Sequence, residues 1–299
     1  MSGPLGRRGL LGLFAAGAVT AVASGCSERT VDGPEGNPST GPASPGAGTS
    51  SPSDSTGGTG GESDAGSPPS KDEIVSQYAD AHPGEFGLEV SGVRLALPEG
   101  CSAAALTFDA CDDESGVDEQ LLQGLIRREI PATLFVNRRW AQAHPDTMEM
   151  IVDEELFAVQ NHGDEHRPLS VSGAAAYGVA GTASPAEVFD EIMGNQNFLR
   201  EEYGVECDFF RSGTAHLDET SAQICRDLGL TPVNFTVNLD DGGTLPPEAV
   251  AARVGEISSR DIALGHFNQP GSGTHAGLQE ALPQLLEQGL RFVTLQQAC

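Results

Sequence analysis

The sequence predicts an α/β fold built on about seven parallel strands, because apolar runs alternate with helical stretches through most of the chain. The runs of strand length lie at 103–108, 132–136, 156–160, 208–211, 232–237, 261–266 and 291–295. The clearest helical stretches are 118–128, 185–203, 218–228, 246–257 and 276–288. A parallel sheet of this kind, closed as a barrel or left open, binds ligands at the carboxyl ends of its strands.

The first 25 residues are typical of an export signal. Arg7 and Arg8 precede an apolar run at 10–23, which is shorter than the about 20 residues that span a bilayer. The paired arginines resemble a twin-arginine signal, and residues 23–26 resemble a lipoprotein cleavage site. Cleavage there would leave Cys26 as the lipid-attachment residue, holding the protein on the outer face of a bacterial cytoplasmic membrane. A plain secretory signal would instead release it.

Three further segments follow the signal. Residues 26–70 are mainly Gly, Ser, Pro, Thr and Asp, so they predict a disordered linker that serves as a tether. Residues 71–100 predict a short helix and then a hairpin over 86–97 that turns at Ser91 and Gly92. Residues 101–299 have a size common for one α/β barrel domain.

The charge excludes one class of partner. The net charge is -27, and loss of Arg7 and Arg8 with the signal takes it to -29; Lys71 is the only lysine. Such a surface repels polyanions, so we expect no nucleic-acid partner.

The cysteines suggest disulfides in an exported protein. With Cys26 lipidated, five cysteines remain, enough for up to two bridges. Cys207 and Cys225 are expected at the end of the sheet away from the ligands, where the two could pair. Cys111 and Cys299 are expected at the ligand end, and a bond between them would prevent Cys111 from binding a metal.

Five polar clusters follow apolar runs and are therefore expected to meet at the ligand end of the sheet. They occupy 106–113, 154–169, 209–216, 238–242 and 264–271. His162 and His166 lie just beyond a strand end, where a loop can direct two neutral imidazoles at one divalent metal. Two histidines alone are more often ordinary loop residues, and the other clusters favour the metal site. From His216 and His275 we expect no more than substrate contacts.

The remaining clusters supply acid-base chemistry. Asp109 would either cap a turn or act as a general base beside a divalent ion, which lowers the pKa of water. Arg211 is expected to point inward and to need a carboxylate partner, for which Asp109 is the natural candidate. His266 could protonate a leaving group, with Asp240 or Asp241 raising its pKa. An Asp-Asp-Gly sequence is otherwise typical of a turn.

Taken in order, these motifs give residues 103–295 a resemblance to polysaccharide deacetylases of the NodB-homology type, carbohydrate esterase family four. The matching motifs are Thr107-Phe108-Asp109, His162 through His166, Phe210-Arg211-Ser212-Gly213 and Leu264-Gly265-His266. The resemblance implies a deformed (β/α) barrel. It also implies metal-dependent removal of acetyl groups, N-linked and sometimes O-linked, from polysaccharides such as peptidoglycan or chitin-like oligomers.

Residue by residue, the resemblance implies Asp109 as the base and Arg211 as its partner. It implies His162 and His166 as metal ligands. His266 would be the general acid, and Asp240 the carboxylate that tunes it. These six positions follow from the match to the family's motifs, not from spacing alone.

One departure concerns the metal. Family members usually have a second aspartate after the first, as the third protein ligand, and here that position is Ala110. Cys111, Asp112 or Asp113 could replace it, or the two histidines could hold the ion with Asp109 and waters; we take Asp112 as the candidate. A thiolate would favour zinc, whereas carboxylates leave cobalt and other divalent ions open.

Ala110 also leaves a second function open, a catalytically impaired barrel that binds glycans as a lipoprotein. A third, a solute-binding lipoprotein, shares the signal and linker but would need two lobes. The single-domain pattern does not support it.

Overall fold

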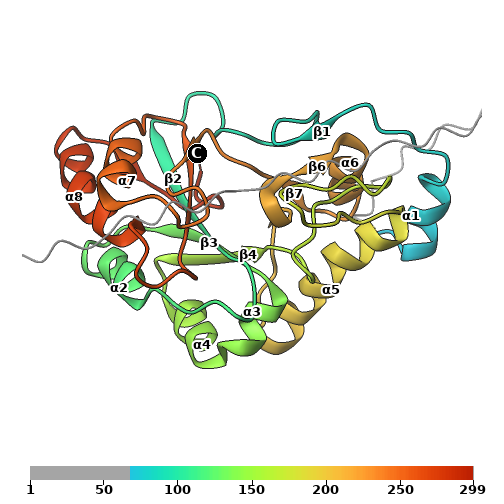
Figure 1. The fold of residues 1–299 in the computed structure, drawn as a ribbon, viewed down its shortest axis with the longest axis horizontal. Helices are drawn as coiled ribbons and strands as arrows, with labels where there is room; N and C mark the ends of the chain where they lie inside the picture. The colour runs from blue at the N-terminus through green and yellow to red at the C-terminus, as the bar shows by residue number, and fades with distance from the viewer. Residues whose placement is uncertain (1–67, 299) are drawn as a thin grey trace, which may run out of the picture. The chain divides into compact units, whose positions relative to one another are not determined.

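The computed structural model describes residues 68–298, drawn in colour in Figure 1. The predicted export signal, the lipid attachment at Cys26 and nearly all of the predicted linker lie outside these residues. Within 68–298, no helix has both the length and the apolarity to cross a bilayer.

A parallel sheet forms the centre of the described domain. From edge to edge its order is β7 (Thr231–Pro232), β5 (Phe209–Phe210), β4 (Phe157–Asn161), β3 (Ala132–Val136), β2 (Ala103–Ala110), β9 (Ile262–His266) and β8 (Val237–Asn238). Every neighbouring pair in this order is parallel, and β10 (Arg291–Phe292) pairs in parallel with the start of β2. The seven strands curl into a half-barrel, which confirms the predicted fold class.

The helices pack in two groups. In one, α2 (Glu119–Arg127) and α7 (Pro247–Val254) contact α8 (Thr274–Glu287); in the other, α1 (Lys71–Gln77) and α6 (Glu219–Asp227) contact α5 (Pro185–Tyr203). Figure 1 shows the two groups on opposite sides of the strands. Two short helices that the sequence analysis missed, α3 (Arg138–Ala143) and α4 (Pro145–Asp153), connect β3 to β4.

The predicted hairpin over 86–97 was wrong. Its first half, β1 (Phe86–Gly87), pairs with β6 (Leu217–Asp218) in an antiparallel manner. Its second half forms bridges from Arg94 to Val233 and from Ala96 to Asp261. Alternating apolar residues fit any strand edge, and here each half pairs with a distant segment rather than with the other.

The predicted strand 232–237 is in fact divided between the two edges of the sheet. β7 pairs with β5 at one edge, and β8 pairs with β9 at the other. The five peptide steps from Pro232 to Val237 can span at most roughly 18 Å. The two edges must therefore lie close together, so this crossing segment, residues 233–236, enforces the curl of the sheet.

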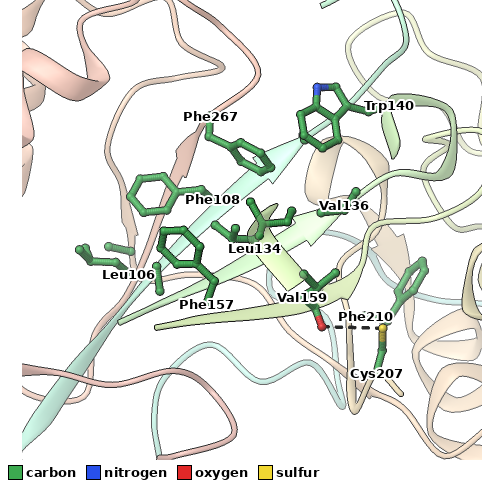
Figure 2. Packing of buried hydrophobic residues seen from close by; sticks show 14 of the residues in the cluster. Leu106, Phe108, Leu134, Val136, Trp140, Phe157, Val159, Cys207, Phe210 and Phe267 are labelled. Atoms are coloured by element: carbon green, nitrogen blue, oxygen red, sulfur yellow. Dashed lines mark hydrogen bonds between the residues drawn. The ribbon is translucent and has the colours of Figure 1, made fainter. Parts of the chain in front are cut away.

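Alternation along β2 separates the core from the barrel interior. Leu106, Phe108 and Ala110 belong to the larger hydrophobic cluster, in which Phe108 lies near Leu134 and Phe157 (Figure 2). Side chains alternate between the two faces of a strand, so Asp109 lies on the opposite face from Phe108 and Ala110. Asp109 accordingly lines a cavity, whereas Ala110 is buried in the core.

The suggested disulfides were wrong. Cys207 and Cys225 are both free and buried, and burial raises the pKa of each thiol. Cys207 faces the core, with its Sγ 3.9 Å from the carbonyl oxygen of Val159 (Figure 2). Cys111 is free, so it is not bonded to Cys299, which lies outside the described residues. Cys101, which the sequence analysis left unpaired, is disulfide-bonded.

Candidate active site

A cavity of about 570 Å³ lies at the carboxyl ends of the strands. Asp109 reaches it from β2, His266 from the end of β9, and His162 and His166 from the loop after β4. Asn238, at the end of β8, adds a further polar side chain. The parallel sheet thus brings together clusters that are far apart in the sequence, as the strand pattern predicted.

A cysteine and two histidines form a cluster of metal-ligand atoms in this cavity. One ligand atom from each of Cys111, His162 and His166 lies within 4.8 Å of the other two. The Sγ of Cys111 is 3.7 Å from Nε2 of His162, and the two imidazole rings meet at 79°. One thiolate and two imidazoles make a donor set typical of zinc, and three protein ligands leave a position for water or substrate. The residues therefore fit a divalent metal.

Asp112, the third ligand favoured by the sequence analysis, does not belong to this cluster. Its Oδ1 accepts the backbone N–H groups of Glu114 and Ser115, at 3.0 and 2.9 Å. The carboxylate of Asp112 therefore closes a turn in its own loop, while the thiol of Cys111 points to the histidines.

Hydrogen bonding fixes which nitrogen of His162 faces the cluster. The Nδ1 of His162 donates to the carbonyl oxygen of Arg211 at 2.9 Å, since a carbonyl can only accept. Nε2 is then the nitrogen directed at Cys111 and Asp109. Burial is the largest single effect and opposes protonation of this ring, but the charge of Asp109, together with Cys111 and the carbonyl oxygen of Arg211, outweighs it and raises the pKa of His162. The lone pair on Nε2 that would take up this proton can instead bind a metal ion.

The predicted partnership of Asp109 and Arg211 is present. Nη1 of Arg211 donates to Oδ1 of Asp109 at 2.8 Å, and Arg211 is completely buried. The guanidinium also donates to the carbonyl oxygens of Val233 and Asn234 and lies 4.2 Å from the centre of the Phe135 ring. Burial is the largest single effect and favours a neutral Asp109, yet the positive charge of Arg211 together with His162 and His266 outweighs it and keeps the pKa of this carboxyl below its usual value. Asp109 is therefore ionised at neutral pH.

His266 has a carboxylate partner, and it is Asp240 rather than Asp241. Nδ1 of His266 donates to Oδ1 of Asp240 at 2.8 Å, while the backbone N–H of His266 and the hydroxyl of Thr274 donate to Oδ2. Burial is the largest single effect and lowers the pKa of His266, but the completely buried Asp240 together with Cys111 outweighs it and raises that pKa well above the ordinary value. Asp241 instead lies among the residues that line the cavity.

Buried polar side chains from α5 and from the N-cap of α3 hold the histidine loop in place. The carboxylate of Glu191 accepts the backbone N–H groups on both sides of His166, those of Glu165 and Arg167, at 3.0 and 3.1 Å. Nδ2 of Asn137 donates to the carbonyl oxygen of Gly163 at 2.7 Å. These supports were not anticipated. The available signal was a run of polar residues on an otherwise buried face of the helix 185–203.

Residues 97–233 match a family model described as polysaccharide deacetylase. No curated protein shows significant similarity to the chain.

Several solved structures have a fold similar to that of this chain. A pseudoenzyme of carbohydrate esterase family 4 from Bacillus anthracis, BA3943, has 21% identity and a TM-score of 0.59 over 70% of this chain and 69% of its own. The peptidoglycan N-acetylglucosamine deacetylase Bc1960 has 22% identity and a TM-score of 0.59 over 69% and 92%. A family 4 carbohydrate esterase from Streptomyces lividans, solved with acetate, has 23% identity and a TM-score of 0.54 over 67% and 97%.

Backbone strain concentrates around the cavity. Among residues 68–298, seven residues other than glycine have positive φ, and five of them line the cavity: His166, Tyr177, Thr214, Ala215 and Asp241. Such conformations cost of order 1–3 kcal/mol each and persist where the surroundings impose them, which is common at functional sites. The positions of these strained residues therefore point to the same cavity as the sequence motifs do.

Of the two further histidines considered as substrate contacts, one lies beside the cavity and the other does not. His216 lies beside the cavity, with its ring 5.1 Å from that of Tyr177. His275 lies on α8 against Gly124 of α2 and is not among the residues that line the cavity. A substrate contact from His275 at this site is therefore excluded, because α8 begins one residue earlier and directs it between two helices.

Gly213 of the third motif allows two loops to touch. A Cβ at this position would lie 2.2 Å from the carbonyl carbon and oxygen of His166. We expect Gly213→Ala to destabilise the protein by at least about 1–3 kcal/mol, the usual cost of overpacking, and to weaken zinc binding by displacing His166. Thermal unfolding and zinc titration measure the two effects. Gly87→Ala, where no atom lies within 4 Å of the new Cβ, is the control. Equal behaviour of the two variants would contradict the expectation.

Proposed function

We propose that this protein is an exported, metal-dependent deacetylase that hydrolyses acetyl amides, and acetyl esters where present, on a cell-wall or extracellular polysaccharide such as peptidoglycan or a chitin-like oligomer. The observation that carries the proposal is the convergence of three units on one cavity. These are the Asp109–Arg211 pair, the His266–Asp240 pair and the metal-ligand cluster Cys111, His162 and His166. The match to the polysaccharide deacetylase model supports the same chemistry.

Asp109 acts as the general base. Arg211 binds Oδ1, which leaves Oδ2 on the side of His162 and the cavity. Since its pKa is held below the usual value, the carboxylate is ionised and can accept a proton from the water that attacks the acetyl carbonyl. Arg211 keeps the carboxylate in one orientation and itself takes no part in proton transfer.

His266 acts as the general acid. Because Nδ1 is engaged by Asp240, Nε2 is the nitrogen left to give a proton to the departing sugar amine. The raised pKa of His266 keeps the ring protonated near neutral pH, as an acid requires. Asp109 and His266 lie side by side, because they are paired in register on the adjacent strands β2 and β9.

The metal completes the site. Cys111, His162 and His166 would hold a divalent ion, and a bound ion would polarise the acetyl carbonyl and lower the pKa of water. The thiolate favours zinc, with cobalt as a close substitute.

The location of the protein is part of the proposal. The signal pattern at 1–25 and the cleavage site at Cys26 support attachment by lipid to the outer face of the bacterial cytoplasmic membrane, or secretion. The linker at 26–70 would give the domain reach into the cell wall.

The test is acetate release from N-acetylglucosamine oligomers and from peptidoglycan by the purified protein, before and after chelation. We expect release that stops on chelation and returns on addition of zinc or cobalt, because a metal ion held by the cluster would supply the Lewis acidity of the site. Metal content is measured in parallel. Acetate release that persists at full rate in metal-free protein would contradict the proposal.

A second candidate, a glycan-binding barrel without activity, is favoured by one observation. Ala110 is buried in the core, so the position that usually supplies a metal ligand in the family cannot do so here. A protein of the same fold, BA3943, is described as a pseudoenzyme. Glycan binding with neither metal nor acetate release would select this candidate.

A further inference from the structure

Tyr177 is a large aromatic residue left in solvent at the rim of the cavity. Its exposed fraction is 81%, higher than that of any other large hydrophobic side chain in residues 68–298. It nevertheless belongs to the lining of the cavity that contains Asp109 and the metal-ligand cluster. Exposure of the ring gives up free energy that burial would provide, so packing does not account for its position.

The backbone beneath Tyr177 is also unfavourable for a tyrosine. Its φ is +50°, followed by Gly178 at +82°, so both central residues of the turn are left-handed. Ala176 and Val179 close the turn with N–H···O bonds of 3.1 and 2.9 Å. Asparagine or glycine would adopt this conformation at lower cost. Neither the ring nor the backbone at position 177 thus serves stability.

The turn is held rigidly at its base. The hydroxyl of Thr182 accepts the backbone N–H of Ser170 and donates to the carbonyl oxygen of Ser170, both at 2.7 Å. Arg167 forms an ion pair with Glu187 at 2.9 Å. At the tip, the ring of Tyr177 meets that of His216 edge to face, at 5.1 Å and 89°. These contacts anchor the base of the loop and place the ring of Tyr177 against that of His216, which reduces the entropy that the loop loses when a ligand binds.

The residues around Tyr177 indicate what kind of ligand its ring would bind. A pyranose ring carries C–H bonds on its faces and hydroxyls at its periphery, so its face packs well on the negative face of an aromatic ring. The apolar side chains of Leu88 and Phe235 also line the cavity. The carboxylate of Asp241 lines it too, and this negative charge opposes an anionic sugar beside it.

We propose that Tyr177 is a stacking platform for a sugar ring next to the acetylated one, so that the preferred substrate is a neutral N-acetylated oligosaccharide of at least two rings. The proposal rests on the proposed function for the identity of the acetylated ring. It assigns to the turn at 176–179 the selection of oligomers over single sugars.

The experiment compares steady-state acetate release from N-acetylglucosamine and from its pentamer. Wild type, Tyr177→Ala, Tyr177→Phe and Val179→Ala are the four proteins. Val179 is exposed on the same turn but does not line the cavity. We expect Tyr177→Ala to raise KM for the pentamer about tenfold, equivalent to about 1.4 kcal/mol, with little change in kcat, and to remove most of the preference for pentamer over monomer. Tyr177→Phe and Val179→Ala should keep that preference, since the first retains the ring.

A binding measurement separates this proposal from the proposed function. Calorimetric titration of the pentamer into Asp109→Asn protein, with and without Tyr177→Ala, reports affinity without turnover. Tyr177-dependent binding supports the platform even if no acetate is released from any substrate. Equal pentamer affinity in the two proteins, or an unchanged pentamer KM in Tyr177→Ala, overturns the platform even if deacetylation itself is established.

Discussion

Replacement of Asp109 by asparagine is expected to lower the rate of acetate release by about a hundredfold to ten-thousandfold, the usual contribution of a positioned general base. The amide oxygen of asparagine can still accept the hydrogen bond from Arg211, but the side chain can no longer take a proton from water. The loss should appear mainly in kcat, since Asp109 is assigned no role in holding the sugar. Initial rates on the N-acetylglucosamine pentamer measure it.

Two controls accompany this variant. Asp112→Asn removes a carboxylate from the same loop outside the metal-ligand cluster, and it should retain activity within a few-fold of wild type. Thermal unfolding shows whether Asp109→Asn is folded, because the buried guanidinium of Arg211 loses its charge partner and loss of a buried partner costs about 3–5 kcal/mol. A folded Asp109→Asn protein that hydrolyses the pentamer near the wild-type rate would remove Asp109 from the role of base.

Replacement of Cys111 by serine is expected to lower zinc affinity by at least about a hundredfold, because loss of outer supports alone costs 10–100-fold and here a direct ligand is lost. Only two histidines would remain in the cluster, and a neutral hydroxyl is a much poorer donor than a thiolate. Burial raises the pKa of the Cys111 thiol, but the neighbouring imidazoles outweigh burial and hold that pKa well below its ordinary value. The wild-type thiol is thus prepared to bind as a thiolate.

Cobalt provides the readout for Cys111 independently of activity. Cobalt bound to a thiolate absorbs in the near ultraviolet through charge transfer from sulfur, so wild-type protein loaded with cobalt should show this band and Cys111→Ser should not. Asp112→Asn keeps the Oδ1 acceptor of that turn but removes the carboxylate that the sequence analysis favoured as a ligand, and it should keep both the band and the zinc affinity. A cobalt spectrum without a sulfur band in wild type would exclude Cys111 as a ligand.

The parts of the fold and site that could be predicted depend on local patterns. Strand length and apolarity located β2, β3, β4 and β9 to within two residues, and the polar residues after them met because parallel strands end at one edge. Asp109, His162 and His266 were found this way. Helix α5 was located at its observed bounds. Ser184 and Pro185 signal its start, and the structure shows that Gly204 ends it in a left-handed conformation.

The sequence could not show which of two adjacent residues, or which of several strand edges, makes a given contact. Cys111 and Asp112 are adjacent, and only the turn closed by Asp112 decides which side chain reaches the histidines. Glu191 could be read as an ordinary helical surface residue until the loop that it supports is seen. The hairpin failed for a similar reason, since the sequence shows that a segment is extended but not which edge it joins.

The crossing segment at 233–236 couples the integrity of the barrel to that of the site. The guanidinium of Arg211 donates to the carbonyl oxygens of Val233 and Asn234 in this segment, and the same guanidinium holds Asp109. Fluctuations that detach the segment from the sheet would also release Asp109 from its partner. We therefore expect native-state hydrogen exchange to show the crossing segment and the backbone around Asp109 opening together, as one cooperative unit.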